Sequence, residues 1–407
     1  MAGPLSHLRV LDLSRVLAGP WAAQNLADLG AEVIKVERPG AGDDTRSWGP
    51  PWMKDSAGND TTESAYFLSV NRNKKSLTLD IAKPEGQKIA RELADKCQVL
   101  IENYKVGTLK RYGLAYETLK QTNPSLIYCS VTGFGQDGPY APRPGYDFIF
   151  QGMGGLMSIT GERDGQPGAG PQKVGIAITD VLTGMYASVA ILAAITHRER
   201  TGQGQFIDSA LLDTIVAFNA NQIVPYFTSG KIPLRWGNAH PQVVPYEVFP
   251  AADGHIILAI GNDSQFTSFC QAAGCPELAQ EPRFKTMSQR IVHRGELTPL
   301  ISEVMRTRSK AEWIAMLEAA NVPCGPINNM KEVFEDPQVL HRKLRVDIPH
   351  PLGGAAPVVA SPLRLSATPV DYRLAPPTLG QHNEEILKGI LGKTDAEIAS
   401  LKKAGIV

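Results

Sequence analysis

The sequence of 407 residues lacks the marks of several common enzyme classes. It has only eight His and five Cys, and no two His stand in an H-x-x-x-H or H-E-x-x-H pattern. A zinc-type hydrolytic site therefore lacks its ligands, and we expect no bound metal. No G-x-S-x-G elbow marks a serine hydrolase, and no Walker loop marks a nucleotide hydrolase.

An excess of charge of either sign is also absent. Lys and Arg together number 41, as do Asp and Glu, so the formal net charge is zero. This balance argues against a nucleic-acid partner or a polybasic membrane anchor, and favours small molecules or a second copy of the chain. The N-terminus shows no basic region followed by an apolar stretch, and no run of about 18 apolar residues occurs. The odd, scattered cysteines fit free thiols in a reducing compartment, so we expect a cytoplasmic protein without a membrane segment.

What the sequence does contain is an alternation of strands and helices. The run "LRVLDLS" (8–14) suits a buried strand, "PWAAQNLADLG" (20–30) suits a helix, and "EVIKVE" (32–37) is again strand-like. A strand, a helix and a strand at this spacing form a βαβ unit, which predicts a parallel sheet. The fold class is therefore α/β, with a doubly wound Rossmann-like large domain. Further strands are expected at 76–81, 98–103 and 125–133, a helix at 83–97, and a strand leading into a helix at 205–218.

The pattern changes after about residue 225. "YEVFPAADGHIILAIG" (246–261) predicts a hairpin around Asp253-Gly254. The Pro-, Gly- and Asn-rich stretch 321–330 is typical of a linker, and 379–401 is expected to be helical. Other helices are expected near 263–273, 294–307 and 309–320. The predicted domains are a large one over 1–224, a small inserted α+β domain over 225–330, and a return segment over 331–407 that completes the large domain.

Dinucleotide binding is the first function to test on such a start. The first strand-to-helix turn, "SRVLAGP", carries one glycine, Gly19, and no G-x-G-x-x-G. Without those glycines the backbone cannot approach a pyrophosphate as NAD binding requires, so we expect no NAD. Arg38, which follows Glu37 at the end of the second strand, suits a phosphate group, although a solvated strand end would show the same pair.

A single carboxylate stands at the start of the apolar stretch "ITDVLTGMYASVAILAAITHRER". The stretch is apolar on nearly every side, which predicts a helix inside the protein. Asp180 at its N-terminus is by default a cap that accepts backbone N–H groups. The helix dipole and free amides would also keep this carboxylate ionised when partly buried, and an ionised, desolvated carboxylate can attack a thioester carbonyl. A cap and a nucleophile both fit the pattern.

The segments "LRVLDLSRVLAGPWAAQNLADLGAEVIKVERPGAGDDTR", "NRNKKSLTLD", "PGYDFIFQGMGGLMSITG", "ITDVLTGMYA" and "RTGQGQFIDSALLD" follow one another along the chain. In this order and spacing they resemble the class III CoA-transferases, the formyl-CoA and carnitine CoA-transferase family, and the resemblance covers essentially the full length.

The resemblance implies roles for particular residues. Asp180 would be catalytic, forming first a mixed anhydride with the acyl group and then an aspartyl-CoA thioester, with Asp147 close by. CoA, brought in as an acyl-CoA co-substrate, would be held by the turn residues Val16 and Ala18 and by the side chains of Arg38, Asn103 and Arg111. Members of the family form interlocked homodimers, which the resemblance implies here as well.

Two departures point away from oxalate as the acceptor acid. Family members that act on oxalate carry His and Gln where this chain has Arg15 and Leu17, and a glycine run that "RWGNAHPQVVPYE" lacks. The segments "AGDDTRSWGPPW", "RWGNAHPQVVPYEVF" and "GPINNMKEVF" look most like the succinyl-CoA–glutarate (hydroxymethylglutarate) branch, which moves CoA between dicarboxylic acids. The second carboxylate of such an acid needs a cation or amides, for which the candidates are Arg46, Arg72 and, first, Arg235. A surface ion pair is the alternative role for each of them.

Two rival functions stay open at this point. The α-methylacyl-CoA racemases share the fold that the resemblance implies and use a His and an Asp as two bases. This chain has Tyr146 where that His would stand, and a Tyr is a poor base at neutral pH. A non-catalytic CoA-binding protein is the second rival, and the intact "ITD" motif argues against it.

Overall fold

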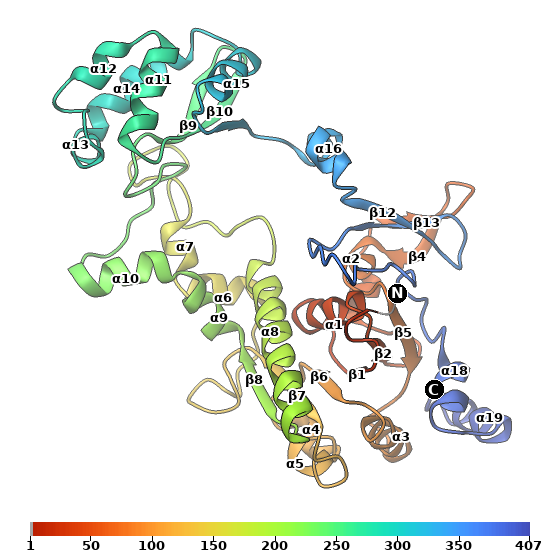
Figure 1. Ribbon diagram of the computed structural model, residues 1–407. Helices are drawn as coiled ribbons and strands as arrows, with labels where there is room; N and C mark the ends of the chain where they lie inside the picture. The colour runs from red at the N-terminus through yellow and green to blue at the C-terminus, as the bar shows by residue number, and fades with distance from the viewer. Residues whose placement is uncertain (1–2) are drawn as a thin grey trace. The chain divides into compact units, whose positions relative to one another are not determined.

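The computed structural model describes residues 3–407 (Figure 1), and the chain divides into two compact units. The first unit comprises the chain up to Leu156, then Val174–Thr228 and Leu340–Val407, and the second comprises Met157–Lys173 and Ser229–Val339. The predicted boundaries after 224 and 330 lie close to those observed after 228 and 339. The placement of 157–173 in the second unit was not anticipated, because its Gly-rich sequence carries no strand or helix period.

A six-stranded parallel sheet forms the centre of the first unit, in the order β5-β2-β1-β6-β7-β8. Strands β6 and β7 are buried along their whole length, which is why they read as continuous apolar runs. The chain proceeds from β1 outward through β2 to β5, and then crosses to β6 on the other side of β1. The predicted doubly wound α/β class is confirmed. The strands are β1 (Arg9–Asp12), β2 (Glu32–Glu37), β5 (Lys74–Thr78), β6 (Val99–Glu102), β7 (Ile127–Thr132) and β8 (Phe206–Ala210).

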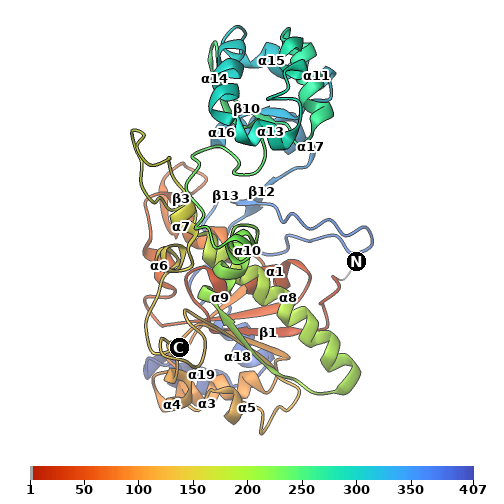
Figure 2. The same ribbon diagram turned by 90° about the vertical axis from the view of Figure 1, so that its left-hand side faces the viewer.

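Helices cover both faces of this sheet. In Figure 2 helices α1 and α8 lie on one side of the strands, and α3, α18 and α19 lie on the other. This arrangement follows from the right-handed βαβ connection, which returns each helix onto a sheet face. The helices of this unit are α1 (Ala18–Asp28), α2 (Ala65–Ser69), α3 (Pro84–Ala94), α4 (Thr108–Arg111), α5 (Tyr116–Leu119), α6 (Asp147–Met153), α8 (Ile178–Thr201), α9 (Leu211–Phe218), α18 (Asn383–Gly389) and α19 (Asp395–Lys403).

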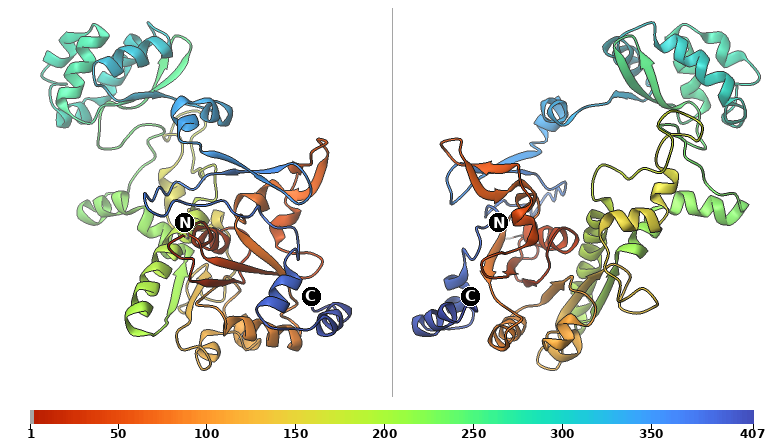
Figure 3. Two further views of the ribbon diagram at one scale, coloured as in Figure 1. Left: turned by 45° about the vertical axis from the view of Figure 1, so that its right-hand side comes forward. Right: turned by 180° about the vertical axis from the view of Figure 1, so that it is seen from behind.

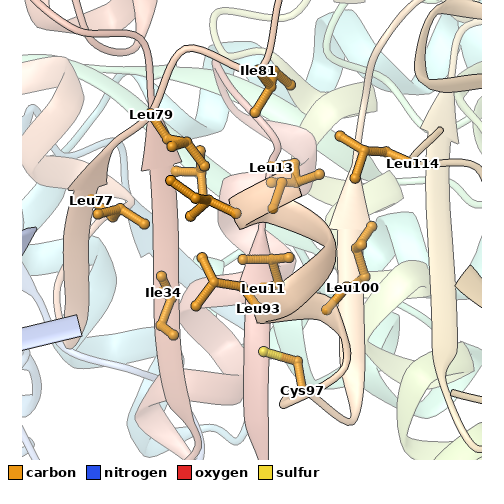
Figure 4. Packing of buried hydrophobic residues seen from close by; sticks show 14 of the residues in the cluster. Leu11, Leu13, Ile34, Leu77, Leu79, Ile81, Leu93, Cys97, Leu100 and Leu114 are labelled. Atoms are coloured by element: carbon orange, nitrogen blue, oxygen red, sulfur yellow. The ribbon is translucent and has the colours of Figure 1, made fainter. Parts of the chain in front are cut away.

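The core on one face of the sheet joins four strands to one helix. Figure 4 shows Leu11, Ile34, Leu77 and Leu100, from β1, β2, β5 and β6, gathered around Leu93 of α3, and all five are completely buried. Burial of one such side chain contributes roughly 1.5–3 kcal/mol, so this layer fixes α3 on the sheet.

The C-terminal segment protects the edge strand β5 (Figure 3). The N–H of Ser76 donates to His382 Nδ1, and the N–H of Thr78 donates to Asn383 Oδ1. These bonds use edge donors that would otherwise invite pairing with another chain. The predicted single helix over 379–401 is wrong in one respect: it consists of α18 and α19, with Gly392 in a left-handed conformation between them.

The second unit has its own core around a three-stranded sheet in the order β11-β10-β9. The predicted hairpin around Asp253-Gly254 is confirmed as the antiparallel pair β9–β10. The stretch 321–330 is not only a linker, because β11 joins the hairpin from it. The elements here are β9 (Tyr246–Ala251), β10 (Gly254–Ala259), β11 (Cys324–Pro326), α11 (Asp263–Ala273), α12 (Pro276–Gln280), α13 (Met287–Val292), α14 (Arg294–Met305), α15 (Lys310–Ala319) and α16 (Met330–Glu335).

Short elements complete the chain. Two antiparallel pairs, β3–β4 and β12–β13, belong to the first unit, and three helices lie where the chain passes between the units. These elements are η1 (Asp44–Ser47), β3 (Trp52–Lys54), β4 (Asp60–Ser64), β12 (Arg345–Pro349), β13 (Ala355–Val359), α7 (Leu156–Ile159), α10 (Ala220–Ser229) and α17 (Pro337–His341).

Helix α8 is the longest helix of the described chain, and it departs from the prediction of full burial. Its Ala187 and Ile191 are buried, whereas Tyr186 and Val189 are 52% and 59% exposed. By length and composition α8 is also apolar enough to cross a membrane, with a mean hydropathy of 1.7, but the core helix of a soluble protein meets the same test. One face of α8 packs on α1 and the sheet, and the opposite apolar face is open in the single chain.

We predict that Gly184→Ala destabilises the first unit. A Cβ at position 184 would lie 2.6 Å from the Ala18 carbonyl oxygen and 2.9 Å from Trp21 Cβ, so α8 would be forced away from α1. The expected loss is about 1–3 kcal/mol in the free energy of unfolding, measured by urea denaturation. Gly389→Ala, at the end of α18 where an added Cβ meets nothing within 4 Å, is the control. Equal stability of the Gly184 variant and wild type would contradict the close α1–α8 packing.

Candidate active site

The candidate site lies between β1 and β6, where the order of strand addition reverses: β2 and β5 follow on one side of β1, and β6, β7 and β8 on the other. Open α/β sheets bind ligands at the carboxyl ends of the strands at such a point. The loops that follow the two strands are joined by Asn103, whose Oδ1 accepts the Arg15 N–H at 3.0 Å and whose Nδ2 donates to the Arg15 carbonyl oxygen at 2.7 Å. One side chain thereby fixes both backbone groups of Arg15.

Two cavities open on either side of this junction, and Arg15 and Tyr104 line both. The first, of about 280 Å³, is called the β2 cavity. The second, of about 190 Å³, is called the Asp180 cavity. Because they share these two lining residues, the cavities adjoin each other. The β2 cavity is lined by residues that include Ser14, Lys35, Glu37, Arg38, Asp43, Leu79 and Tyr112. The Asp180 cavity is lined by residues that include Val16, Leu17, Ala18, Asn103, Lys105, Arg143, Tyr146 and Asp180.

Asp180 lies in the first turn of α8 but does not cap it. The helix begins at Ile178 and its N-cap is Ala177, so the prediction that Asp180 opens the helix is wrong by two residues. The acceptor for this helix start is Asp147 instead, whose Oδ1 accepts the Thr179 N–H at 2.7 Å. The carboxylate of Asp180 is therefore available for another role.

Gln151 holds Asp147 and the segment before α8 in place. Its Nε2 donates to Asp147 Oδ2 at 2.6 Å and to the Ile176 carbonyl oxygen at 3.2 Å, and its Oε1 accepts the Val174 N–H at 3.0 Å. Gln151 is completely buried. Sequence reasoning missed it, although its position one helical turn after Asp147 in "GYDFIFQ" was the available signal.

The electrostatics of Asp180 also differ from the prediction. Burial, and after it the negative charge of Asp147, raise the pKa of Asp180 to about 7. The dipole of α8 was expected to keep the carboxylate anionic, but in this structure desolvation is the larger effect. Asp180 is thus a carboxyl group whose anion is unfavourable and which loses its proton near neutral pH.

Tyr66, to which the sequence analysis gave no role, lies within electrostatic reach of this carboxyl group. Burial, followed by the charges of Asp180, Asp147 and Asp43, raises the pKa of Tyr66 to about 12. The ring of Trp48 meets the Tyr66 ring edge-on, with 5.0 Å between centroids. Trp48 therefore helps to fix a tyrosine that faces the charges of the site.

Comparison with known proteins shows which family the chain belongs to. The model of CoA-transferase family III matches residues 5–383. The chain belongs to this family. It is 49% identical to the succinate–glutarate CoA-transferase of Agrobacterium fabrum, over 94% of this chain and 95% of the relative. It is 46% identical to the human succinyl-CoA:glutarate CoA-transferase, over 99% of this chain and 90% of the relative.

A solved structure agrees with these sequence matches. The crystal structure of a CAIB/BAIF family protein from Brucella suis superimposes with a TM-score of 0.84 at 45% identity, covering 96% of this chain and all of the other. The protein is therefore an enzyme, a class III CoA-transferase, which takes an acyl-CoA as co-substrate.

The structure brings together most of the residues that the sequence analysis assigned to CoA. Val16, Ala18 and Asn103 line the Asp180 cavity, and Arg38 lines the β2 cavity. Arg111 lines neither of these two cavities and lies exposed at the end of α4, where its neighbour Tyr112 reaches the β2 cavity instead.

Arg46 and Arg72, two of the arginines proposed for a second substrate carboxylate, are bound inside the protein. Arg46 donates to both oxygens of Glu37 and to Glu63, and Arg72 donates to both oxygens of Asp28. Both guanidinium groups are more than nine-tenths buried, so these contacts support structural ion pairs and give a substrate role no support.

Arg235, the first candidate, belongs to the second unit. It forms an ion pair with Asp164 and donates to the Glu162 carbonyl oxygen. Its role toward a substrate stays a prediction. Three other cations, Arg15, Lys105 and Arg143, line the same cavity as Asp180, and the sequence analysis assigned none of them to a substrate.

Asp180→Asn should gain stability relative to wild type as the pH rises. The pKa of Asp180 is about 7 in the folded protein and near 3.8 when unfolded, so the unfolded state binds fewer protons between these values and wild-type stability falls across this window. Asn has no charge to form, so the variant should gain up to about 4 kcal/mol over wild type between pH 4 and pH 8. Urea denaturation at both pH values measures this, and Asp137→Asn, at an exposed carboxylate, is the control. A pH-independent difference would contradict the raised pKa.

Proposed function

We propose that this enzyme moves CoA from succinyl-CoA to glutarate or a similar dicarboxylic acid, and that Asp180 carries first the acyl group and then CoA. The observation that carries the mechanism is the position of Asp180, half-buried at the wall of a cavity that shares lining residues with a second, cation-lined cavity. The names of the similar enzymes from Agrobacterium fabrum and human support the choice of substrates.

The reaction needs four substitutions at carbonyl carbon atoms. An oxygen of Asp180 attacks the thioester carbon of the donor, the carbon–sulfur bond breaks, and a mixed anhydride and CoA thiolate result. The thiolate attacks the Asp180 carbonyl carbon, which releases the donor acid as a carboxylate and leaves an aspartyl-CoA thioester. The acceptor carboxylate then attacks that thioester, and the thiolate finally attacks the acceptor carbonyl of the new anhydride. Asp180 leaves as a free carboxylate, and no proton or water is consumed.

The raised pKa of Asp180 favours the first substitution. Burial and the charge of Asp147 make the Asp180 anion unfavourable, whereas the anhydride and the thioester are neutral and relieve this cost. A pKa of about 7 leaves roughly half of the molecules ionised at neutral pH, so the nucleophile is present as well as activated. Partial burial also keeps water from the anhydride, which hydrolysis would destroy.

The cations around the two cavities suit the charges of the substrates. Arg38 in the β2 cavity is suited to a phosphate of CoA, and Arg15, Lys105 and Arg143 at the Asp180 cavity are suited to the pyrophosphate or to the second carboxylate of a dicarboxylic acid.

We also propose a cytoplasmic location, which the free thiol state of all five cysteines supports.

The covalent route predicts a trappable enzyme. Hydroxylamine added during turnover of succinyl-CoA should convert Asp180 to a hydroxamate, detected by mass spectrometry on the tryptic peptide 174–198. Asp180→Asn should lose the label and at least about 1,000-fold in transfer rate, because an amide oxygen is a poor nucleophile. Asp213→Asn, at an exposed carboxylate nearby in the chain, should label like wild type.

Controls separate the mechanism from the substrates. An intact-mass measurement must exclude deamidation of the Asp180→Asn variant back to the wild-type side chain. No label in turning-over wild type would refute the covalent route. Glutarate should be a better acceptor than the monocarboxylate butyrate by at least about tenfold in kcat/KM, since only a dicarboxylate gains a second ionic contact. Equal values would refute the dicarboxylate assignment and leave the covalent route standing.

We further propose that the enzyme is a homodimer that covers the open face of α8. Large apolar side chains are exposed over α6, α8, α9 and α10, more than a lone soluble domain usually leaves open. Light scattering at micromolar concentration should therefore give twice the chain mass of 44.0 kDa, and a mass of one chain would contradict the proposal. The exposed set includes Phe148, Ile149, Met153, Tyr186, Val189, Phe218, Val224, Tyr226 and Phe227.

A further inference from the structure

The turn between β1 and α1 adopts a backbone conformation that its sequence does not favour. Val16 has a φ of 71°, in the left-handed region that β-branched residues rarely occupy. The same turn lines both cavities: Ser14 and Arg15 reach the β2 cavity, and Arg15, Val16, Leu17 and Ala18 reach the Asp180 cavity. A strained turn persists only when its surroundings hold it, so the groups that hold Val16 matter for the site.

Asp43 is the group that binds the backbone of Val16. The Val16 N–H donates to Asp43 Oδ1 and Oδ2 at 3.2 and 3.3 Å. Asp43 is 4% exposed, and its own position is fixed by Lys35 Nζ at 2.8 Å and by the N–H and Oγ1 of Thr45 at 3.0 and 2.8 Å. Four donor groups therefore converge on one buried carboxylate.

The same contacts extend to the neighbouring residues of the turn. Lys35 Nζ also donates to the Ser14 carbonyl oxygen at 3.0 Å, and Asn103 binds both backbone groups of Arg15. Backbone groups of three consecutive residues are thus held by side chains from other loops or strands. The next residues are Leu17, the N-cap of α1, and Ala18, its first residue, and both line the Asp180 cavity.

We propose that Asp43 is a positioning residue for CoA transfer. By binding the Val16 amide it keeps the turn in its left-handed conformation, and the turn in that conformation sets the wall against which the thioester carbonyl lies beside Asp180. Asp43 acts through Val16 and takes no part in bond making. The inference rests on the proposed place of the thioester in the Asp180 cavity.

The charge of Asp43 is constant over the working range of an enzyme. Burial alone would raise its pKa, but the Lys35 ammonium group and the Thr45 donors outweigh burial and hold the pKa of Asp43 at about 2. A positioning role for this anion is therefore independent of pH near neutrality, whereas a role in proton transfer would not be.

The first test is Asp43→Asn. An amide has one acceptor oxygen for four donors, and its own N–H groups would face other donors, so the Val16 bond should weaken or break. We expect kcat for transfer from succinyl-CoA to glutarate to fall about 10- to 100-fold, with a smaller change in KM, because misplacing the reacting groups costs rate more than binding. The pH at which kcat is half-maximal should not move.

The second test relieves the strain itself. Glycine adopts a left-handed φ at little cost, so Val16→Gly in the Asp43→Asn background should recover at least about fivefold of the lost kcat. In the wild-type background Val16→Gly should give no such gain. Strictly additive effects of the two changes would overturn the proposal, because Asp43 would then not act through Val16.

The control is a second buried carboxylate that does not reach the turn. Asp28, 2% exposed and paired with Arg72 at the far end of α1, should on change to Asn lower the melting temperature and leave kcat per folded enzyme at the wild-type value. Wild-type kcat in folded Asp43→Asn would overturn the proposal. Should this variant not fold, Thr45→Val removes one donor that orients the same carboxylate and should lower kcat about two- to fivefold; an unchanged kcat would overturn the proposal equally.

The hydroxylamine label on wild type distinguishes failure of the Asp180 proposal from failure of the Asp43 proposal. Loss of the label in wild type refutes the covalent role of Asp180, and the kcat ratios still judge Asp43. A labelled wild type with an unaffected Asp43→Asn refutes the positioning role alone.

Discussion

The hydrogen bond from the Thr179 amide to the Asp147 carboxylate is the contact on which the rest of the site depends. It ties α6 to the first turn of α8 and so sets where Asp180 lies. It also brings a second negative charge next to Asp180, which together with burial raises the pKa of that carboxyl group to about 7. The bond therefore fixes the position of Asp180 and adds the charge of Asp147 to the larger effect of burial on its pKa. In the usual arrangement the acid at a helix start caps its own helix, and the amides that it accepts would have lowered its pKa.

Beneath the cavities lies a cluster of buried charges that is unusual in a parallel sheet. Lys35 pairs with Asp43 at 2.8 Å and Lys74 pairs with Asp12 at 2.9 Å, all almost fully buried. Burial outweighs the attraction of Asp12 and lowers the pKa of Lys74 to about 8. At Lys35 the attraction of Asp43 and other carboxylates outweighs burial and raises the pKa to about 12. Both lysines also bind backbone groups around the turn. Lys74 donates to the Pro20 carbonyl oxygen and Lys35 to that of Ser14, which fixes the turn and the start of α1.

The open face of α8 and the reactive end of the same helix are linked by packing. Gly184 lets α8 approach α1 to the distance of a backbone contact, one turn after Asp180. The opposite face presents Tyr186 and Val189 to solvent in the single chain. A partner that covered this face would hold the helix from both sides and keep water from its first turn. Assembly and catalysis would then depend on the same helix.

The alternation of strands and helices, and with it the fold class, could be predicted from the sequence because parallel strands buried on both faces are mostly apolar. The pattern also drew attention to Asp180, a lone carboxylate at the start of an apolar helix, but a cap fitted it as well as a nucleophile, and the catalytic role was implied by the family resemblance. The sequence could not show that Asp147, more than thirty residues away, caps that helix and raises the pKa of Asp180. Nor could it show that Arg46 and Arg72 are already neutralised, or that a valine is held in a left-handed conformation by Asp43. Periodicity reports which face of an element is buried, whereas the charge state of a group and the strain of a turn depend on neighbours that only the folded chain brings together.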